Sequence, residues 1–186
     1  IEQGRRLEQE KIDIGLVTAI AAPTRFDLNI KGRNDHSGNT PMHMRRDALV
    51  GAAEIVLAVE NIASQVNDSC VGTVGVLDVT PGVMNVVPGH VHMQIDVRDI
   101  NTRGKHSACK ALNERIAEIS TRRSLDIETN ILCDDIPVPM DATLRTRIAK
   151  KAQHLNISCV EMPSGAGHDA MNFADIVPTT LLFIPS

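Results

Sequence analysis

The clearest hydrophobic pattern in this chain of 186 residues is a strict alternation between positions 90 and 98. Every second residue in this stretch is apolar, namely Val91, Met93, Ile95 and Val97. A period of two predicts a β-strand with one buried face and one open face. The polar set includes Asp96 and Arg98, which are therefore expected on the open face, where an arginine is available to bind an anion.

Similar patterns predict the elements on either side of this strand. Strands are expected at about 24–31, 71–79 and 125–131, and amphipathic helices at about 45–65 and 103–121. The resulting order, β-α-β-β-α-β between about residues 24 and 133, is that of a ferredoxin-like domain. Each helix has a single apolar stripe, so both helices are expected to cover the same face of one sheet.

The two ends of the chain predict part of a different fold. Residues 14–22 form an apolar run typical of a strand, and Asp141 is placed to cap a helix reaching about Leu155, with Leu155 inward. A short strand near 157–161, a glycine-rich turn, a helix start and a buried run at 179–184 follow. We expect segments 1–22 and 135–186 to form an incomplete α/β domain, into which an α+β domain of residues 23–134 is inserted. The lack of an initiator Met and the stop after an apolar run suggest a piece of a longer protein.

Composition narrows the class of protein. Hydrophobic residues make up 42% and charged residues 23%, as in ordinary globular proteins. A net charge of −4 with no basic block argues against nucleic acid as a partner, and no apolar run approaches the roughly 20 residues of a membrane span. The four scattered cysteines predict reduced, mostly buried thiols in a cytoplasmic protein.

The turn Ser164-Gly165-Ala166-Gly167-His168-Asp169-Ala170 concentrates the candidate chemistry of the C-terminal segment. Its glycines allow the backbone to approach a ligand closely. His168 is suited either to metal ligation or to acid–base work. The alternative interpretation is a simple glycine-rich turn, in which Asp169 caps a helix and His168 is exposed.

Five motifs occur in one order along the chain: Ile1-Glu2-Gln3-Gly4, GRNDHSGNTPM from Gly32 to Met42, NVVPG from Asn85 to Gly89, Ile95-Asp96-Val97-Arg98, and the turn that contains His168. Together they resemble the hydantoinase/carbamoylase family of amidases, within the aminoacylase/carboxypeptidase group of two-metal hydrolases. The resemblance implies a catalytic α/β domain with two divalent ions. It also implies an inserted ferredoxin-like domain that forms a homodimer and acts as a lid.

The resemblance also assigns roles to individual residues. His168 aligns with a metal ligand, and His36 aligns with a histidine that reaches into the partner subunit's active site. Asn85 and Arg98 align with residues that bind the substrate's carboxylate end, so we expect Asn85 beside Arg98. The two ions, zinc or manganese, belong to the whole protein, and this chain by itself is expected to bind none. The general-base glutamate and further ligands are expected upstream of Ile1, so no catalytic residue is assigned in this chain, and Met171 stands where many relatives have Gln.

Each residue to which the resemblance assigns a role could instead have a purely structural one. Arg98 could pair with Asp96 or Asp99, Asn85 could be a turn residue, and His36 could be a solvated loop residue. The other histidines have no motif around them and are expected to be exposed: His43, His90, His92, His106 and His154.

The expected reaction is cleavage of the ureido C–N bond of an N-carbamoyl-L-amino acid, allantoate or a related small-molecule ureido acid. One alternative is a two-metal aminoacylase or peptidase that cleaves acyl or peptide amides. The other is a non-catalytic ferredoxin-like module for binding or dimerisation.

Overall fold

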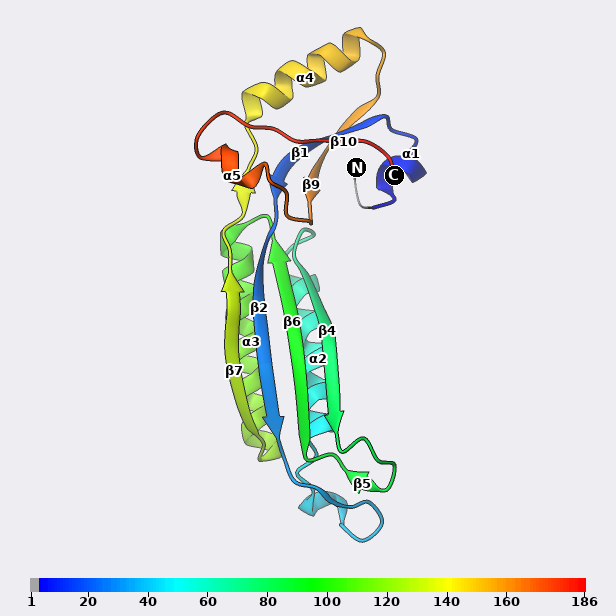
Figure 1. The fold of residues 1–186 in the computed structure, drawn as a ribbon, viewed down its shortest axis with the longest axis vertical. Coiled ribbons are helices and arrows are strands. Elements are labelled where there is room, and N and C mark those ends of the chain that lie inside the picture. Colours follow the sequence, from blue (N-terminus) through cyan, green and yellow to red (C-terminus); the bar gives the residue numbers. More distant parts are fainter. Residues whose placement is uncertain (1–3) are drawn as a thin grey trace. The chain divides into compact units, whose positions relative to one another are not determined.

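A computed structural model describes residues 4–186 of the chain (Figure 1). By internal packing the chain divides into two units. The central unit consists of Pro23–Arg98 and Arg103–Asp134, and the flanking unit consists of the segments up to Ala22, Asp99–Thr102 and Asp135–Ser186. The first three residues of the Ile1-Glu2-Gln3-Gly4 motif lie outside the described residues.

The central unit has the predicted β-α-β-β-α-β order. Its elements are β2 (Ala22–Lys31), α2 (Ala48–Val66), β4 (Val71–Thr80), β6 (His90–Asp99), α3 (Thr102–Arg123) and β7 (Asp126–Asp134). The four strands form one sheet in the order β4-β6-β2-β7, in which β4 pairs antiparallel with β6 and β7 pairs antiparallel with β2. The ferredoxin-like arrangement is confirmed.

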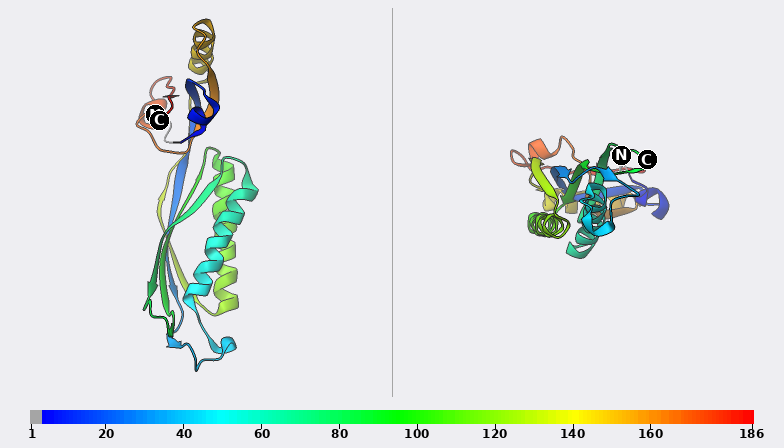
Figure 2. Two further views of the ribbon diagram at one scale, coloured as in Figure 1. Left: turned by 90° about the vertical axis from the view of Figure 1, so that its right-hand side faces the viewer. Right: turned by 90° about the horizontal axis from the view of Figure 1, so that it is seen from below.

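Both helices of the central unit lie on the same face of its sheet and leave the other face open (Figure 2). The buried side chains of β6 are the predicted apolar set, and they join one core with β2 and the two helices. The open face carries the polar set of β6, including Asp96 and Arg98, which are half-buried. The alternation along β6 therefore sets which side chains are available for chemistry.

Helix α2 begins at Ala48, three residues later than the sequence suggested, because Asp47 caps it. The Asp47 carboxylate accepts from the backbone amides of Leu49 and Val50 at 3.0 and 3.2 Å. Within residues 4–186, α2 is the helix whose length and apolar composition would suffice to cross a bilayer. Core helices share this property, and the buried side chains of α2, such as Ile55 and Val59, pack into the core under the sheet.

Two short strands occur where the sequence pattern predicted only a loop and turns. β3 (Asp35–His36) pairs antiparallel with β5 (Val86–Val87), and a 3₁₀ turn, η1 (Met42–Met44), follows β3. These elements form one end of the central unit, which we call the tip (Figure 1).

The flanking unit is organised around β1 (Ile14–Ile20). β1 pairs antiparallel with β8 (Val138–Pro139) and β10 (Leu182–Phe183), and parallel with β9 (Cys159–Ser164). The remaining elements are α1 (Arg6–Glu10), α4 (Ala142–His154) and α5 (Met171–Ala174). The N-terminal and C-terminal segments of the chain therefore pack together, as expected, and Asp141 caps α4 through a 2.7 Å bond from Leu144 N.

Two expectations for the flanking unit, and one for the cysteines of the whole chain, were wrong. The run 179–184 is not a buried strand, because only two of its residues are extended and Phe183 is buried while Leu182 and Ile184 are exposed. Leu155 is also exposed rather than inward. The cysteines are free, but Cys70 is the buried one, Cys109 and Cys133 are half-buried, and Cys159 is exposed.

Candidate functional site

The tip brings the GRNDHSGNTPM and NVVPG motifs together. Within the β3–β5 pair His36 lies opposite Val86, and Ser37 N donates to Asn85 O at 3.0 Å. Farther along, Gly32 N donates to Gly89 O at 2.8 Å. A Cβ at Gly89 would come within 2.3 Å of Asn34 Oδ1, so only glycine allows this close approach. The structure therefore places His36 and Asn85 side by side.

The hydrogen bonds of His36 determine its tautomer. Its Nδ1 accepts from two backbone amides, Gly38 N at 3.1 Å and Asn39 N at 3.3 Å. A ring nitrogen that accepts carries no proton, so in the neutral ring the proton lies on Nε2. His36 is exposed, and its Nε2 takes part in neither of these two bonds. The side chain is thus prepared to donate a hydrogen bond.

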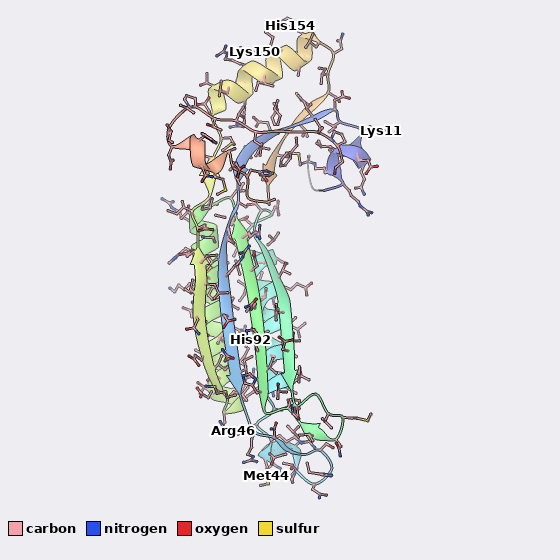
Figure 3. All side chains as sticks on the ribbon, viewed as in Figure 1. Lys11, Met44, Arg46, His92, Lys150 and His154 are labelled. Atoms are coloured by element: carbon pink, nitrogen blue, oxygen red, sulfur yellow. The ribbon has the colours of Figure 1, made fainter. Side chains whose placement is uncertain are left out.

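Arg45 holds the loop that carries His36. Its Nε donates to Thr40 O at 3.0 Å and its Nη2 donates to Ser37 O at 2.5 Å. Met42, Met44 and Met84 are exposed near His36 and Asn85, and Figure 3 shows Met44 and Arg46 at this end of the central unit. The tip therefore combines a hydrogen-bond donor, His36, in a loop held by Arg45, with exposed apolar side chains.

Arg98 lies on the open face of β6 and is already engaged within the chain. Its Nε and Nη2 donate to the two oxygens of Asp96 at 2.6 and 3.0 Å, and Arg25 Nε donates to Asp96 at 2.9 Å. The bond to Asp96 raises the pKa of Arg98. Burial acts to raise the pKa of Asp96, but the bonds from Arg98 and Arg25 lower it overall. The Nε and Nη2 groups of Arg98 are therefore both bonded to Asp96, so the pairing of Arg98 with Asp96 that the sequence left open as an alternative does occur.

Asn85 is not beside Arg98 in one chain, which corrects the expectation. Asn85 precedes β5 at the tip, whereas Arg98 is the ninth residue of β6. The eight residue steps from His90 to Arg98 in an extended strand span about 26 Å. This is much longer than a small ureido acid, so one chain cannot hold a single substrate with both residues.

His168 lies in the turn between β9 and α5, where a buried serine holds its ring. Ser164 Oγ donates to Ala166 O at 2.8 Å, so its contact of 2.9 Å with His168 Nε2 is a bond donated by the imidazole. The ring of His168 also packs against Phe183, with centroids 5.4 Å apart. The unprotonated nitrogen is then Nδ1, which has the lone pair that a metal ligand needs.

Asp169 does not cap α5 with its side chain, because Ala170 occupies the cap position and no side-chain bond forms there.

The described residues fit a two-metal site only in part. His168 supplies one oriented imidazole, but residues 4–186 contain no group of three or more His, Cys, Asp or Glu side chains that could hold a metal ion. Met171 starts α5 and packs against the flanking core, so it offers an apolar contact at that position. The side chains of residues 4–186 therefore do not by themselves form a metal centre.

A second polar cluster on the open face was missed from the sequence. His92 was expected to be exposed, but it is half-buried, with Nε2 2.7 Å from Asp27 Oδ1 and Nδ1 3.5 Å from Asp78 Oδ2. Gln94 also donates to Asp27 at 2.9 Å. The alternation along β2 and β6 placed Asp27 and His92 on polar faces, but the strand register that joins them is a property of the folded sheet.

These features match one protein family. Residues 23–124, more than half of the chain, match the family model described as the peptidase dimerisation domain. The chain belongs to this family, and the match covers most of the central unit.

The relatives that match the whole chain identify the kind of protein in which this domain occurs. An uncharacterised hydrolase of Haemophilus influenzae is 47% identical over 100% of this chain and 45% of its own length. An N-carbamoyl-L-amino-acid amidohydrolase of Paenarthrobacter aurescens is 36% identical with the same coverage. The crystal structure of a hydantoinase/carbamoylase family amidase from Burkholderia multivorans superposes with a TM-score of 0.97 at 32% identity, covering 100% of this chain and 45% of that one.

The resemblance to hydantoinase/carbamoylase amidases is thus confirmed. Other curated relatives are named ureidoglycolate hydrolase and allantoate amidohydrolase. The chain spans about half the length of the curated relatives it matches.

Proposed function

We propose that this chain is part of a cytoplasmic, metal-dependent amidohydrolase. Its substrate is an N-carbamoyl-L-amino acid, allantoate or a related ureido acid, and the ureido C–N bond is cleaved. The observation that carries the proposal is the similarity over the full chain to an N-carbamoyl-L-amino-acid amidohydrolase. In the same proposal, residues 23–134 form the dimerisation and lid domain, and segments 1–22 and 135–186 belong to the catalytic domain.

The residues of the chain have separate tasks in this proposal. Arg98 binds the carboxylate of the substrate, and His168 is one metal ligand of the whole protein. His36 donates its Nε2–H to the ureido carbonyl oxygen, where negative charge develops during attack. The two backbone amides that donate to His36 Nδ1 support this role, because they leave Nε2 as the ring nitrogen that can donate.

The distance along β6 supports action between subunits. His36 and Asn85 share the tip, and Arg98 lies eight residues along β6 from His90, the first residue of that strand. We therefore place the tip of one protomer, with both His36 and Asn85, over the substrate that Arg98 of the other protomer binds. Each active site of the homodimer then needs both chains.

Mixing of inactive variants tests this arrangement in the full-length gene product. His36→Ala or Asn85→Ala mixed with Arg98→Ala yields mixed dimers in which one site carries both lesions and the other carries none. Random exchange should restore about a quarter of the wild-type ammonia release from N-carbamoyl-L-amino acids. His36→Ala mixed with Asn85→Ala is the matched control and should restore nothing, because every site then lacks one tip residue.

The results separate this proposal from its alternatives. Two results would contradict the assignment of the tip to the partner protomer. One is restored activity in the mixture of Asn85→Ala with His36→Ala. The other is a lack of restored activity in both mixtures that contain Arg98→Ala, once subunit exchange has been confirmed. A wild-type protein that hydrolyses N-acetyl amino acids or dipeptides but no ureido acid is an aminoacylase or peptidase instead. A full-length protein without hydrolytic activity is a binding module.

A further inference from the structure

Two arginines converge on one carboxylate on the open face of the central sheet. Arg98 of β6 bonds both oxygens of Asp96, and Arg25 of β2 donates from Nε to Asp96 Oδ2 at 2.9 Å. We call Arg25, Asp96 and Arg98 the arginine cluster. Two guanidinium groups and one carboxylate leave it with a surplus positive charge.

Arg25 is the more accessible of the two arginines. Its side chain is 50% exposed, against 26% for Arg98. Within residues 4–186, Arg25 donates from Nε to Asp96, and its two terminal nitrogens make no other hydrogen bond. A guanidinium held at Nε still presents a planar edge with two N–H groups, which matches the geometry of a carboxylate.

The other charged groups on this face do not neutralise the arginine cluster. Farther along the sheet, Asp27 and Asp78 both contact His92, and Gln94 also donates to Asp27. The carboxylates of Asp27 and Asp78 are therefore engaged around His92, and the surplus positive charge lies at the arginine cluster. An anion that reaches the open face is attracted to the end where Arg25 and Arg98 lie.

A purely structural role accounts poorly for Arg25. Arg98 already bonds both oxygens of Asp96, so the carboxylate does not need a second arginine to be satisfied. An ion pair as exposed as Arg25–Asp96 contributes little to stability. What Arg25 adds is a second guanidinium next to Arg98.

We propose that Arg25 is a second anion-binding residue, which together with Arg98 forms a two-guanidinium site for the carboxylate of the substrate. Arg98 approaches the carboxylate from β6 and Arg25 from β2, while Asp96 lies between them. This inference rests on the proposed function, because it assumes that the anion is the carboxylate of a ureido acid.

The test is a binding titration of the isotope-labelled chain of 186 residues, followed by NMR at the arginine Nε–H groups. The probes are N-carbamoylglycine and its uncharged amide, N-carbamoylglycinamide. Arg25→Gln is compared with Arg115→Gln, a matched control, because Arg115 is 51% exposed and pairs with Glu118 at 3.0 Å on α3, which covers the other face of the sheet. The two variants lose the same charge from the same chain.

We expect N-carbamoylglycine to shift the Nε–H signals of Arg25 and Arg98, and the amide to leave them unchanged. Arg25→Gln should weaken the binding of N-carbamoylglycine roughly five- to tenfold, and Arg115→Gln should not change it. Equal weakening by the two variants, or a wild-type chain whose Arg25 signal does not respond, overturns the proposal.

A third probe separates this inference from the proposed function. N-acetylglycine carries the same carboxylate without the ureido group, so the arginine cluster should bind it as well as it binds N-carbamoylglycine. If Arg25 binds both probes but the full-length protein does not hydrolyse ureido acids, the proposed function fails and the anion site stands. If the protein hydrolyses ureido acids and Arg25→Gln changes neither binding nor KM, the site fails and the function stands.

Discussion

His92 shows how a single residue acquires properties that its sequence neighbourhood does not reveal. It lies on β6 in the open face of the sheet, where Figure 3 labels it, and contacts Asp27 of β2 at 2.7 Å. The hydrogen bond to Asp27 raises the pKa of His92, against the opposing effect of burial. The bonds from Gln94 and then His92 lower the pKa of Asp27. The charged pair is therefore favoured in the folded state.

The His92→Gln variant should lower the stability of the chain in a pH-dependent way. Because folding raises the pKa of His92, its contribution is fully present below the unfolded pKa of about 6.5 and is lost as pH rises through the folded value. We expect the variant to lose on the order of 0.5–1 kcal/mol near pH 5.5 and less near pH 8.5, measured by urea denaturation. In an Asp27→Asn background the pH-dependent part should shrink, and a loss that is the same at both pH values would contradict the assignment.

At the level of elements, α2 and β4 approach each other through a glycine. A Cβ added at Gly72 would lie 2.7 Å from Val59 Cγ1 and 3.2 Å from Val59 O. Gly75, three residues along the same strand at a bulge in the β4–β6 register, has no atom within 4 Å of such a Cβ. The sequence shows two similar glycines, and only Gly72 is needed for packing.

Substitution of these glycines by alanine should therefore have opposite effects. Gly72→Ala forces Val59 or the helix backbone away and should cost about 1–3 kcal/mol. Gly75→Ala fills open space and removes backbone freedom from the unfolded chain, so it should be neutral or stabilise by up to about 1 kcal/mol. Denaturation midpoints at equal m-values measure both variants. Equal destabilisation by the two variants would contradict the assignment of the cost to the α2–β4 contact at Gly72.

At the level of the whole molecule, the edges of the central sheet determine how two copies can meet. The sheet order leaves β4 and β7 as edge strands, whose backbone groups are available for pairing. β4 exposes Val71 and Leu77, and α2, which packs on β4, exposes Val50 and Leu57. This combination of a free edge and nearby apolar side chains favours association through β4 and α2.

We predict that the chain forms a two-fold dimer through this surface at tens of micromolar. Sedimentation should report a dimer for the unmodified chain and a monomer for the Val71→Lys and Leu57→Glu double variant, because charge at the interface is costly to desolvate. Ile131→Lys, an equally exposed position on the β7 edge, is the control and should stay dimeric. A monomeric unmodified chain, or a dimer lost only with Ile131→Lys, would exclude this surface.

The sequence predicted the features that depend on local periodicity. Alternation over 91–97 predicted both the buried set of β6 and the open face that bears Arg98, and helical spacing predicted the apolar faces of α2 and α3. Asp141 was identified as a cap because a cap is a contact within one turn. The order of the strands and helices predicted the ferredoxin-like unit. The family motifs predicted the family, because several motifs in fixed order carry more information than any one pattern.

Only the tertiary structure determined which distant residues meet. The β3–β5 pair brings His36 next to Asn85 and separates both from Arg98, and the β2–β6 neighbourhood joins Arg25 to Asp96 and Asp27 to His92. The expectations that failed, such as the buried run at 179–184 and the Asp169 cap, depended on packing partners or on the local path of the chain. Periodicity determines which face a side chain occupies. Strand register and the close approach of loops determine its neighbours, and these depend on contacts between residues far apart in the sequence.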